Sequence, residues 1–415
     1  MESERPTRRM ELLFVSGDKK CAQAVEDALR GSEESQWNVN VSCDPGEAVE
    51  RLSSERYDLL LAELDLPGQN GLGLFEQALI HSPETIRAVY GSYSRIGDIL
   101  RSSTLVHRFI PKFSAPRELR SSLAGLWALR ERISDPGLAD IVAELQTLPP
   151  VPEVYSRLLD LLHRPEPSIP HIAQCVKQDP ALSAKFLQLV NSAFFGLRSE
   201  VSDPGRAVSL LGLVRTRVLV CSFAIFESFR APHDPPVSLQ KLREHSLQVA
   251  SLSQAFARAA GAGQEVVETS FAAGLLHDVG KLVLSCMIPD TYRHVIEGWR
   301  KGVPLVELEK ALCGTTHSEV GAYLLGLWGL PHALVEAALY HHEPSERKTA
   351  GFLPLTAVHV ADWLAHAIEL EETKAKEERE LELDRGYLAE IGIDEKQLDD
   401  WTLLGRMLLG VKNLS

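Results

Sequence analysis

Histidine and aspartate residues in the second half of the chain stand in surroundings that suggest chemistry. His277 and Asp278 follow the apolar segment 271–276 and precede Val279-Gly280-Lys281, so two potential ligands, a turn and a cation come together. Mixtures of imidazole and carboxylate suit Zn, Mn, Fe or Ni, and two metals that share a carboxylate make a water acidic enough to attack phosphorus. The candidate ligands are His245, His277, Asp278, His317, His341, His342 and Asp362. The sequence therefore predicts that this region binds one or two divalent transition metals.

Single members of this set also have an ordinary structural interpretation. His245 lies in an apolar stripe with Leu242 and Val249, where a solitary histidine is more often a hydrogen-bonded core residue. His317 could cap a helix that follows residues 314–316. The prediction therefore depends on the whole ordered set, because leucine would serve uncharged packing better at each place.

Helices must position these residues, because after Leu138 apolar residues recur three and four positions apart and strand patterns are absent. The prolines within 148–152 fix the backbone and predict a stiff entry to this all-helical body. The expected helices span 154–162, 181–190, 207–226, 239–259, 266–276, 332–340, 353–365 and 401–409. The strongly charged segment 369–385 is expected to be a solvated helix or loop.

The first third of the chain has a different pattern, in which short apolar runs alternate with helical stretches. Such alternation favours an α/β fold, a flavodoxin-like five-stranded parallel sheet wrapped by helices. The expected strands contain residues 12–15, 39–41, 59–61, 88–90 and 109–110, and the expected helices contain 22–29, 47–52 and 72–80. Residues 67–71, Pro-Gly-Gln-Asn-Gly, predict a turn after the third strand.

Residues 10–130 resemble the response-regulator receiver family, through segments 57–63, 66–71 and 108–112. In that family an aspartate after the third strand accepts a phosphoryl group, two acids hold Mg²⁺, a hydroxyl residue ends the fourth strand and a lysine ends the fifth. The resemblance implies a degenerate site in which only the lysine survives. The corresponding positions hold Ser16 and Gly17, Glu63, Gly91 and Lys112. Serine and glycine supply no carboxylate for Mg²⁺, so we expect no phosphorylation.

Glu63 admits two interpretations. Its extra methylene could push the carboxylate toward Lys112 and imitate a phosphorylated aspartate. Alternatively, it is an ordinary acid at a strand end, paired with Lys112. The second interpretation is favoured because a mimic would still need the missing hydroxyl partner, for which Ser92, one place after Gly91, is an imperfect substitute.

The His-Asp-x-Gly-Lys sequence at 277–281, with an earlier histidine, later histidines and a final aspartate, resembles the HD phosphohydrolase superfamily. Segments 148–152, 178–182, 190–196 and 207–212 narrow the resemblance to the HDOD family, a signalling relative of the HD and HD-GYP proteins, over about 141–362. It implies that the seven candidate ligands take the HD-type metal roles and that Lys281 steadies a phosphate. HDOD domains are mostly regulatory and many have lost these ligands, whereas this sequence has kept them.

The Gly-Tyr-Pro loop of HD-GYP cyclic-di-GMP phosphodiesterases is replaced here by 343–348, Glu-Pro-Ser-Glu-Arg-Lys, which argues against cyclic-di-GMP as a substrate. We favour a bacterial signalling protein, a degenerate response regulator whose HDOD domain acts through protein contacts or a ligand-dependent conformational change. Its expected partners are signalling proteins, with a nucleotide or cyclic dinucleotide as the candidate small molecule. The alternative is a metal-dependent phosphohydrolase acting on a nucleotide or phosphodiester, and only there would Lys281 be catalytic.

Composition limits the other classes. The 415 residues, 45% apolar and 24% charged, are typical of a globular protein with more than one domain. The net charge of −14 opposes non-specific attraction to nucleic acid or anionic lipid. We find no DNA-binding motif, nucleotide-cofactor motif, membrane span or signal peptide, and six scattered cysteines favour a reducing cytoplasm. The expected domains are a receiver-like unit at 1–132, a helical linker at 133–147, an HDOD domain at 148–370 with its ligands in 240–365, and a charged segment with a final helix at 371–415.

Overall fold

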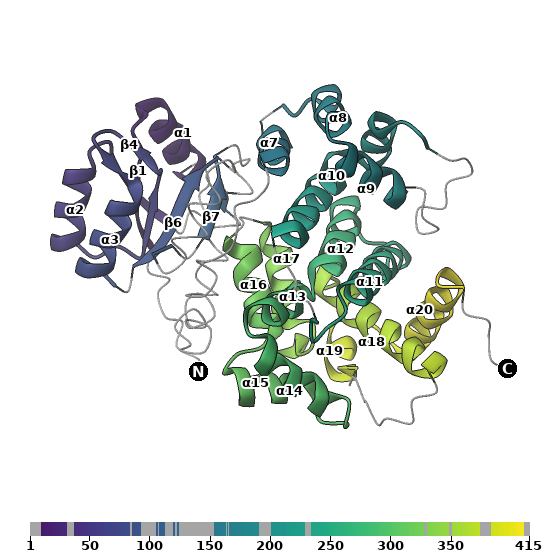
Figure 1. Ribbon diagram of the computed structural model, residues 1–415. Coiled ribbons are helices and arrows are strands. Elements are labelled where there is room, and N and C mark those ends of the chain that lie inside the picture. Colours follow the sequence, from purple (N-terminus) through teal and green to yellow (C-terminus); the bar gives the residue numbers. More distant parts are fainter. Residues whose placement is uncertain are drawn as a thin grey trace.

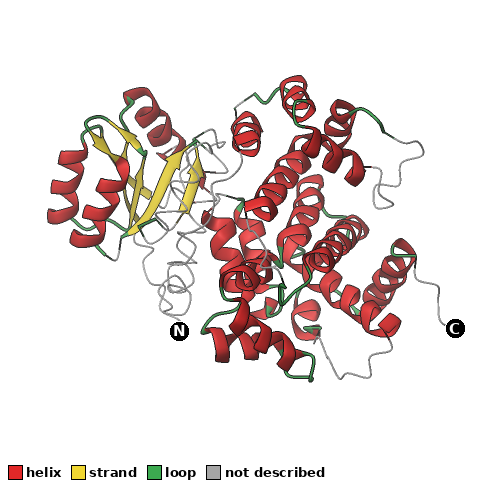
Figure 2. Cartoon of the chain, viewed as in Figure 1, coloured by secondary structure: helices red, strands yellow, loops and turns green. Residues whose placement is uncertain are grey.

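The computed structural model describes residues 10–30, 37–83, 85–92, 105–106, 108–112, 119–120, 123, 153–162, 164, 166–190, 201–228, 234–327, 330–347, 351–373 and 383–410. Within them, a sheet flanked by helices is followed by an all-helical region (Figures 1 and 2). This confirms the predicted fold class. The expected linker at 133–147, the proline-rich entry, the segment 191–196 and most of the charged segment lie outside the described residues, and the domain boundaries stay predictions.

The five predicted strands form one parallel sheet. They are β1 (Met10–Val15), β2 (Trp37–Ser42), β3 (Leu59–Ala62), β6 (Ile86–Gly91) and β7 (Arg108–Pro111), in the order β2-β1-β3-β6-β7. This is the doubly wound flavodoxin-like order, with helices on both faces. Leu12 and Phe14 pack with α1 (Lys19–Arg30), whereas Leu13 and Val15 pack with α2 (Pro45–Ser54) and α3 (Gly71–His81), because successive side chains of a strand point to opposite faces.

The expected turn after β3 is a small hairpin. β4 (Asp65–Leu66) pairs antiparallel with β5 (Gln69–Asn70), and Gly68 between them has a φ of +73°. At Gly71 a Cβ atom would lie 2.3 Å from the carbonyl oxygen of Glu63. The two turn glycines thus allow the chain to fold back tightly beside Glu63.

The helical region contains every helix that the sequence predicted and several that it did not. The predicted ones are α7 (Glu153–Leu162), α9 (Pro180–Val190), α10 (Pro204–Ser228), α11 (Leu239–Ala259), α12 (Gln264–Leu276), α17 (His332–Tyr340), α18 (Pro354–Thr373) and α20 (Glu395–Leu408). The additional ones are α8 (Ile169–Lys177), α13 (Val279–Met287), α14 (Pro289–Trp299), α15 (Leu305–Cys313), α16 (His317–Leu327), the 3₁₀ turn η3 (Pro344–Glu346) and α19 (Arg385–Glu390).

One predicted helix is not continuous. The sequence predicts a single helix over 207–226, but Gly212 inside α10 has a φ of 74° and a ψ of 175°, which breaks the helix. Glycine adopts this left-handed φ without a steric penalty, so the prediction of a straight helix was wrong at this residue. Among the described residues, no single helix is long and apolar enough to cross a membrane. The two halves of α10, Pro204–Leu213 and Arg215–Ala224, reach that length and composition only when taken together.

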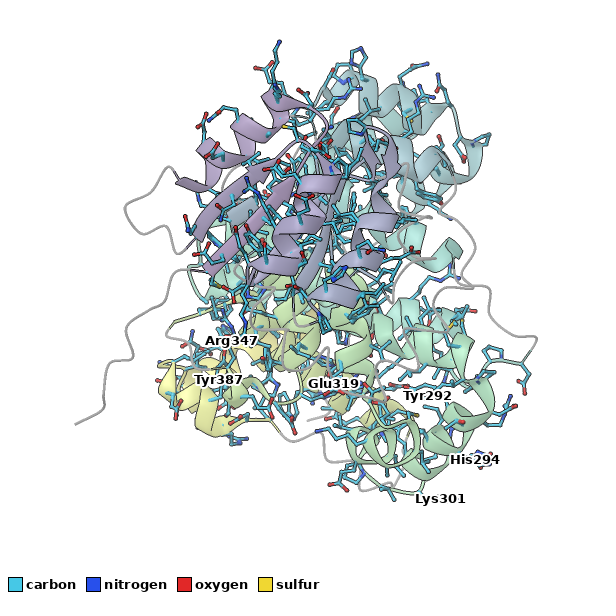
Figure 3. The ribbon with its side chains drawn as sticks, turned by 90° about the vertical axis from the view of Figure 1, so that its left-hand side faces the viewer. Tyr292, His294, Lys301, Glu319, Arg347 and Tyr387 are labelled. Atoms are coloured by element: carbon cyan, nitrogen blue, oxygen red, sulfur yellow. The ribbon has the colours of Figure 1, made fainter. Side chains whose placement is uncertain are left out.

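The sheet and the helical region contact each other directly. The hydroxyl of Ser92, just after β6, donates to the carboxylate of Asp160 on α7 at 2.8 and 2.7 Å. The hydroxyl of Tyr323 on α16 donates to the carbonyl of Val106 at 3.4 Å. In the view of Figure 3 the sheet domain lies nearest the reader, with Tyr292 and Glu319 labelled among the helices below it. One buried apolar cluster contains residues of both regions, so the sheet domain packs directly against the helices.

Candidate metal centre

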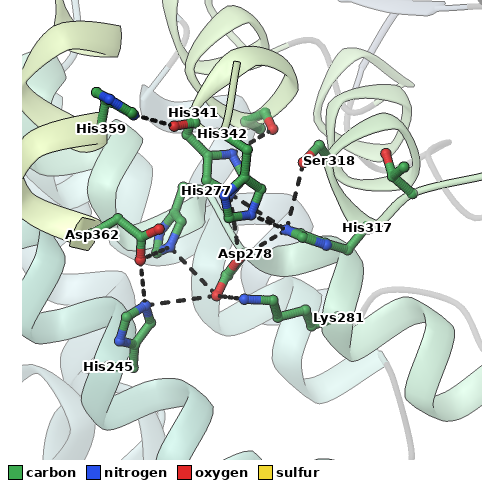
Figure 4. Close-up of polar contacts among 12 residues, drawn as sticks. His245, His277, Asp278, Lys281, His317, Ser318, His341, His342, His359 and Asp362 are labelled. Carbon is green, nitrogen blue, oxygen red and sulfur yellow. Dashed lines mark hydrogen bonds and ion pairs between the residues drawn. The ribbon is translucent and has the colours of Figure 1, made fainter. Parts of the chain in front are cut away.

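Six helices bring the candidate ligands to one place (Figure 4). His245 lies on α11, Asp362 lies on α18, and His277 and Asp278 join α12 to α13. His317 begins α16, and His341 and His342 directly follow α17. The structure therefore gathers all seven predicted residues, and His245 is one of the cluster rather than an isolated core histidine.

A close helix contact explains the glycine after the His-Asp pair. A Cβ atom on Gly280 would lie 1.8 Å from the carbonyl oxygen of His317 and 2.8 Å from the backbone nitrogen of Gly321. Because no side chain fits in that space, α13 can approach the start of α16 only with glycine at position 280. This contact holds Asp278 and His317 on facing helices.

The start of α16 has a cap of its own. The hydroxyl of Thr316 accepts from the backbone N–H of Glu319 at 3.1 Å, and the carboxylate of Glu319 accepts from the N–H of Thr316 at 3.0 Å. This reciprocal pair is a capping box. The cap that the sequence allowed for His317 is therefore Thr316, which leaves the His317 ring for another role.

Three of the histidines are held in one tautomer. Nδ1–H of His277 donates to the carbonyl of Gly274 at 2.8 Å, and Nδ1–H of His341 donates to that of Ala338 at 2.9 Å. Nδ1 of His317 lies 2.7 Å from the buried carboxylate of Glu309. A proton fixed on Nδ1 leaves the lone pair on Nε2, which is how metal-binding histidines are usually oriented.

The Asp278 carboxylate lies between two groups of ligand atoms. Oδ2 faces Nε2 of His277 at 3.4 Å and Nε2 of His245 at 3.7 Å, and these imidazoles lie 3.4 and 2.9 Å from Oδ1 of Asp362. We call His245, His277, Asp278 and Asp362 the first set.

On the other side, Oδ1 of Asp278 faces Nε2 of His317 at 3.4 Å and of His341 at 3.6 Å. Nε2 of His317 lies 3.4 Å from that of His341 and 3.0 Å from that of His342. We call Asp278, His317, His341 and His342 the second set. Ligands about 2.0–2.2 Å from a common ion are themselves roughly 3.0–3.5 Å apart, so most of these separations suit one ion in each set.

Two buried atoms support this fit. Nε2 of His277 and Oδ1 of Asp278 have no hydrogen-bond partner, although both residues are almost fully buried. A buried polar atom without a partner is costly, and a cation between the ligand atoms would remove that cost. Nζ of Lys281 lies 2.6 Å from Oδ2 of Asp278 and partly neutralises the carboxylate.

The electrostatics of the cluster differ between its histidines: His277 is held protonated, whereas His341 and His342 are held neutral. Burial favours the neutral carboxyl, yet His277 and Lys281 hold the pKa of Asp278 well below its usual value. Although burial opposes it, Asp278 and Asp362 raise the pKa of His277 to about 10. Burial lowers the pKa of His341 to about 4, and burial with the adjacent His341 lowers that of His342 well below its usual value. His341 and His342 are thus neutral imidazoles, the form that binds metal.

Sequence reasoning missed three residues around the cluster. Glu309 on α15 also accepts from the Tyr292 hydroxyl at 2.7 Å and from the backbone N–H of His317 at 2.9 Å. His359 on α18 donates to the carbonyl of His341 at 2.7 Å and accepts from the N–H of Asp384 at 2.9 Å. His366 lies near Asp362. No spacing rule points to Glu309 or His359, whereas the separation of Asp362 and His366 by four residues on one helix was a usable signal.

The site of the sheet domain is different. Nζ of Lys112 lies 2.9 Å from Oε1 of Glu63, which also accepts from the Cys21 thiol at 3.2 Å. Ser16 bonds within its own turn, and a Cβ atom on Gly17 would lie 2.8 Å from the ring of Pro67. Gly91 offers no hydroxyl, and Ser92 is engaged by Asp160. Both interpretations of Glu63 require this ion pair, so the pair alone does not choose between them.

Comparisons with known proteins agree with the architecture. The family model of the HDOD domain matches residues 148–344, which therefore form an HDOD domain. An uncharacterized protein of Treponema pallidum (strain Nichols) is 26% identical over 196 residues, which are 46% of this chain and 37% of the relative. The chain thus spans little more than a third of that relative's length.

Two solved structures share the fold. A candidate phosphohydrolase from Shewanella amazonensis SB2B is 21% identical, with a TM-score of 0.50 over 68% of this chain and 100% of that one. A candidate signal transduction protein from Marinobacter aquaeolei VT8 is 18% identical, with a TM-score of 0.50 over 85% of this chain and 77% of that one. At these identities the likeness concerns the fold alone.

Proposed function

We propose that this chain, in which an HDOD domain follows a receiver-like domain, is a signalling protein whose HDOD domain holds a metal centre and acts through protein contacts or a ligand-dependent conformational change. The proposal joins two features of one molecule. The sheet domain has the receiver topology without the acids of its phosphorylation site, and the helical domain gathers the seven candidate ligand residues. We further propose a reducing cytoplasm as its compartment and signalling proteins as its partners.

The observation that carries the proposal is the position of α16 between the two domains. This helix begins with His317 of the second set and, six residues later, contacts the receiver-like domain through Tyr323. A rise of 1.5 Å per residue places these two residues about 9 Å apart along one rigid helix. Metal binding that moves His317 would therefore also move Tyr323 at the edge of the sheet. Conversely, a displacement of the sheet would move His317.

The residues present fit a pair of divalent metals. The first set would hold one ion and the second set the other, with Asp278 between them. Bound metals would supply positive charge for an anionic ligand. Glu309 orients the His317 ring. Lys281 would add its positive charge to that of the metals, at Oδ2 of Asp278, the oxygen that faces the first set.

Hydrogen exchange of the full chain, with and without Mn²⁺, tests the coupling. We expect added metal to protect amides of α16 and of β6 and β7, and we expect Asp160→Ala to reduce the protection of the strands only. Protection that stays within the helical domain in the wild-type protein would contradict signalling through this contact.

The alternative function, a metal-dependent phosphohydrolase, is favoured by one specific observation. Asp278 is shared by both sets and is paired with Lys281, an arrangement that could activate water and steady a phosphate. The segment that follows the paired histidines forms a 3₁₀ turn, Pro344–Glu346, in place of the Gly-Tyr-Pro loop, and its acid is poorly suited to cradling an anionic substrate. Positioning of a substrate can lower the activation barrier by about 7–11 kcal/mol. A metal centre without a loop that positions the substrate is therefore expected to have low turnover.

A turnover assay separates the two functions. Bis(p-nitrophenyl) phosphate, cyclic dinucleotides and mononucleotides are incubated with the full chain and added Mn²⁺, Fe²⁺ or Ni²⁺. We expect rates at background. Hydrolysis that disappears in Asp278→Ala would establish the phosphohydrolase and make the receiver-like domain its regulatory appendage.

A further inference from the structure

We propose that His366 is an additional metal ligand, which joins His245 and Asp362 at the solvent side of the first set. The inference rests on the proposed metal centre and extends it by one residue. Nε2 of His366 lies 3.4 Å from Oδ1 of Asp362, and Nε2 of His245 lies 2.9 Å from the same oxygen. Ligand atoms of these three residues all lie within 4.8 Å of one another.

Helix geometry explains how two ligands come from α18. Asp362 and His366 are four residues apart, so their side chains lie one above the other on the same face of the helix. Ligand pairs at this spacing recur in metal sites because one helix then presents two donors to one ion. His245 on α11 faces the pair, with its ring centroid 4.4 Å from that of His366.

The distance between His366 and Asp362 suits a shared ion better than a direct hydrogen bond. A good N–H···O bond is about 2.7–3.2 Å long, whereas two ligands of one ion are roughly 3.0–3.5 Å apart. On the other side of the ring, Nδ1 lies 3.8 Å from the carboxylate of Glu369. A proton on Nδ1 would face that carboxylate and leave the Nε2 lone pair for the metal.

His359, on the same face of the same helix, shows what a structural histidine looks like here. Both of its ring nitrogens form short hydrogen bonds, at 2.7 Å to the carbonyl of His341 and at 2.9 Å to the N–H of Asp384. The nitrogens of His366 instead face two carboxylates at 3.4 and 3.8 Å. The two histidines are seven residues apart on one helix, so the difference lies in their partners and not in the backbone.

The exposed fractions of the side chains place His366 on the solvent side of the first set. The side chains of His245 and His366 are each 13% exposed, whereas those of His277 and Asp362 are 0% and 3% exposed. With His366 bound, the first set supplies five protein groups to its metal region. Fewer positions then remain for water or a substrate, which agrees with a regulatory centre.

The test is a titration of the full chain, stripped of metal, with Co²⁺, followed by calorimetry and by visible absorption, which responds to coordination number. His366→Ala is compared with the wild-type protein and with His332→Ala. His332 is a matched control because it also pairs with an acid four residues away on its helix, Glu336 at 3.0 Å, outside the ligand sets. His366→Gln retains a polar side chain of similar size and serves if the alanine variant folds poorly.

We expect both His366 variants to bind one of the ions at least about tenfold more weakly and to change the Co²⁺ spectrum, while His332→Ala leaves both unchanged. Unchanged affinity, stoichiometry and spectrum in the His366 variants, with Co²⁺ bound by the wild-type protein, would overturn this inference alone. Absence of Co²⁺ binding by the wild-type protein would instead overturn the proposed metal centre itself.

Discussion

The two domains differ in how the carboxylates of their buried acids, Glu63 and Asp278, are partnered. In the receiver-like domain, Glu63 is paired with Lys112 at 2.9 Å and accepts from the Cys21 thiol at 3.2 Å. In the HDOD domain, Asp278 is paired with Lys281 through Oδ2, but its Oδ1 has no hydrogen-bond partner and faces histidines at 3.4 and 3.6 Å.

This difference separates an acid whose partners all lie within the protein from one that still has an atom available to a ligand. Where a lysine and a thiol satisfy the acid within the protein, nothing further is needed at that position. Where an acid and an imidazole are buried with unpartnered atoms, their burial lowers the stability of the fold unless a bound ligand such as a cation pairs with those atoms. The pairing of an acid with a lysine alone would not separate the two cases, because both sites contain such a pair.

The largest expected effect is the loss of metal binding when the shared pair is removed. In the double variant His277→Ala with Asp278→Ala, the first set loses two ligands and the second set loses one, so bound metal should fall to background by elemental analysis. An excess of 100 Kd of metal should stabilise the wild-type protein by about 2.7 kcal/mol and leave the variant unaffected. Glu63→Gln should keep the full metal content. Wild-type stoichiometry in the double variant would show that the ligands are elsewhere.

The next largest effect concerns the close contact of α13 with α16. Gly280→Ala should lower the free energy of unfolding of the metal-free protein by about 3 kcal/mol in urea, because the new Cβ atom would lie 1.8 Å from the carbonyl of His317. Gly386→Ala is the matched control, since its Cβ atom would come no closer than 3.4 Å to the atoms around it. A change of less than about 0.5 kcal/mol in Gly280→Ala would mean that the two helices separate freely.

A smaller effect is expected from the acid that orients His317. Glu309→Gln should weaken the binding of one ion by about 10–100-fold, as is common when a partner of a metal-binding histidine is changed. Calorimetry measures the affinity, and Glu307→Gln, on the exposed side of the same helix, should leave it unchanged. Equal affinities in the two variants would remove Glu309 from the metal centre.

The smallest effects belong to the receiver-like site. Glu63→Gln should cost at most about 1 kcal/mol of stability, because Lys112 is 37% exposed and water screens the pair. If Glu63 instead imitates a phosphorylated aspartate, the change should alter signalling. Incubation with acetyl phosphate and Mg²⁺ should add no mass to the protein, and a stable adduct on residues 1–130 would show that the site still accepts phosphate.

The Cys21 thiol reports on the same site. Burial and the neighbouring Glu63 raise its pKa to about 11, so the thiol form is favoured and alkylation by iodoacetamide should accelerate about tenfold per pH unit until that value is reached. Glu63→Gln removes a negative charge and should shift the rate profile to lower pH. An identical profile in the variant would mean that burial alone sets the reactivity.

Much of the fold could be predicted because the patterns that encode it are local. Alternating apolar runs identified the five strands, and recurrence at three and four residues identified eight helices of the second half. The break of α10 could not be predicted, because a glycine inside an apolar helical pattern does not reveal its own φ. The helices α13 and α16 were missed because they are buried and apolar on nearly all sides, so no helical period stands out in their sequences.

The sequence by itself determined which residues were available as ligands and which chemistry the receiver-like domain lacks, since residue types are read directly from it. Only the tertiary structure decided that His245 meets Asp362, 117 residues away, that Asp278 separates two sets, and that Glu309 belongs to the cluster. The physical reason is that a ligand site depends on distances of a few ångströms between side chains on different helices. Those distances are set by helix packing, such as the contact that Gly280 permits, and local periodicity in the sequence carries no record of them.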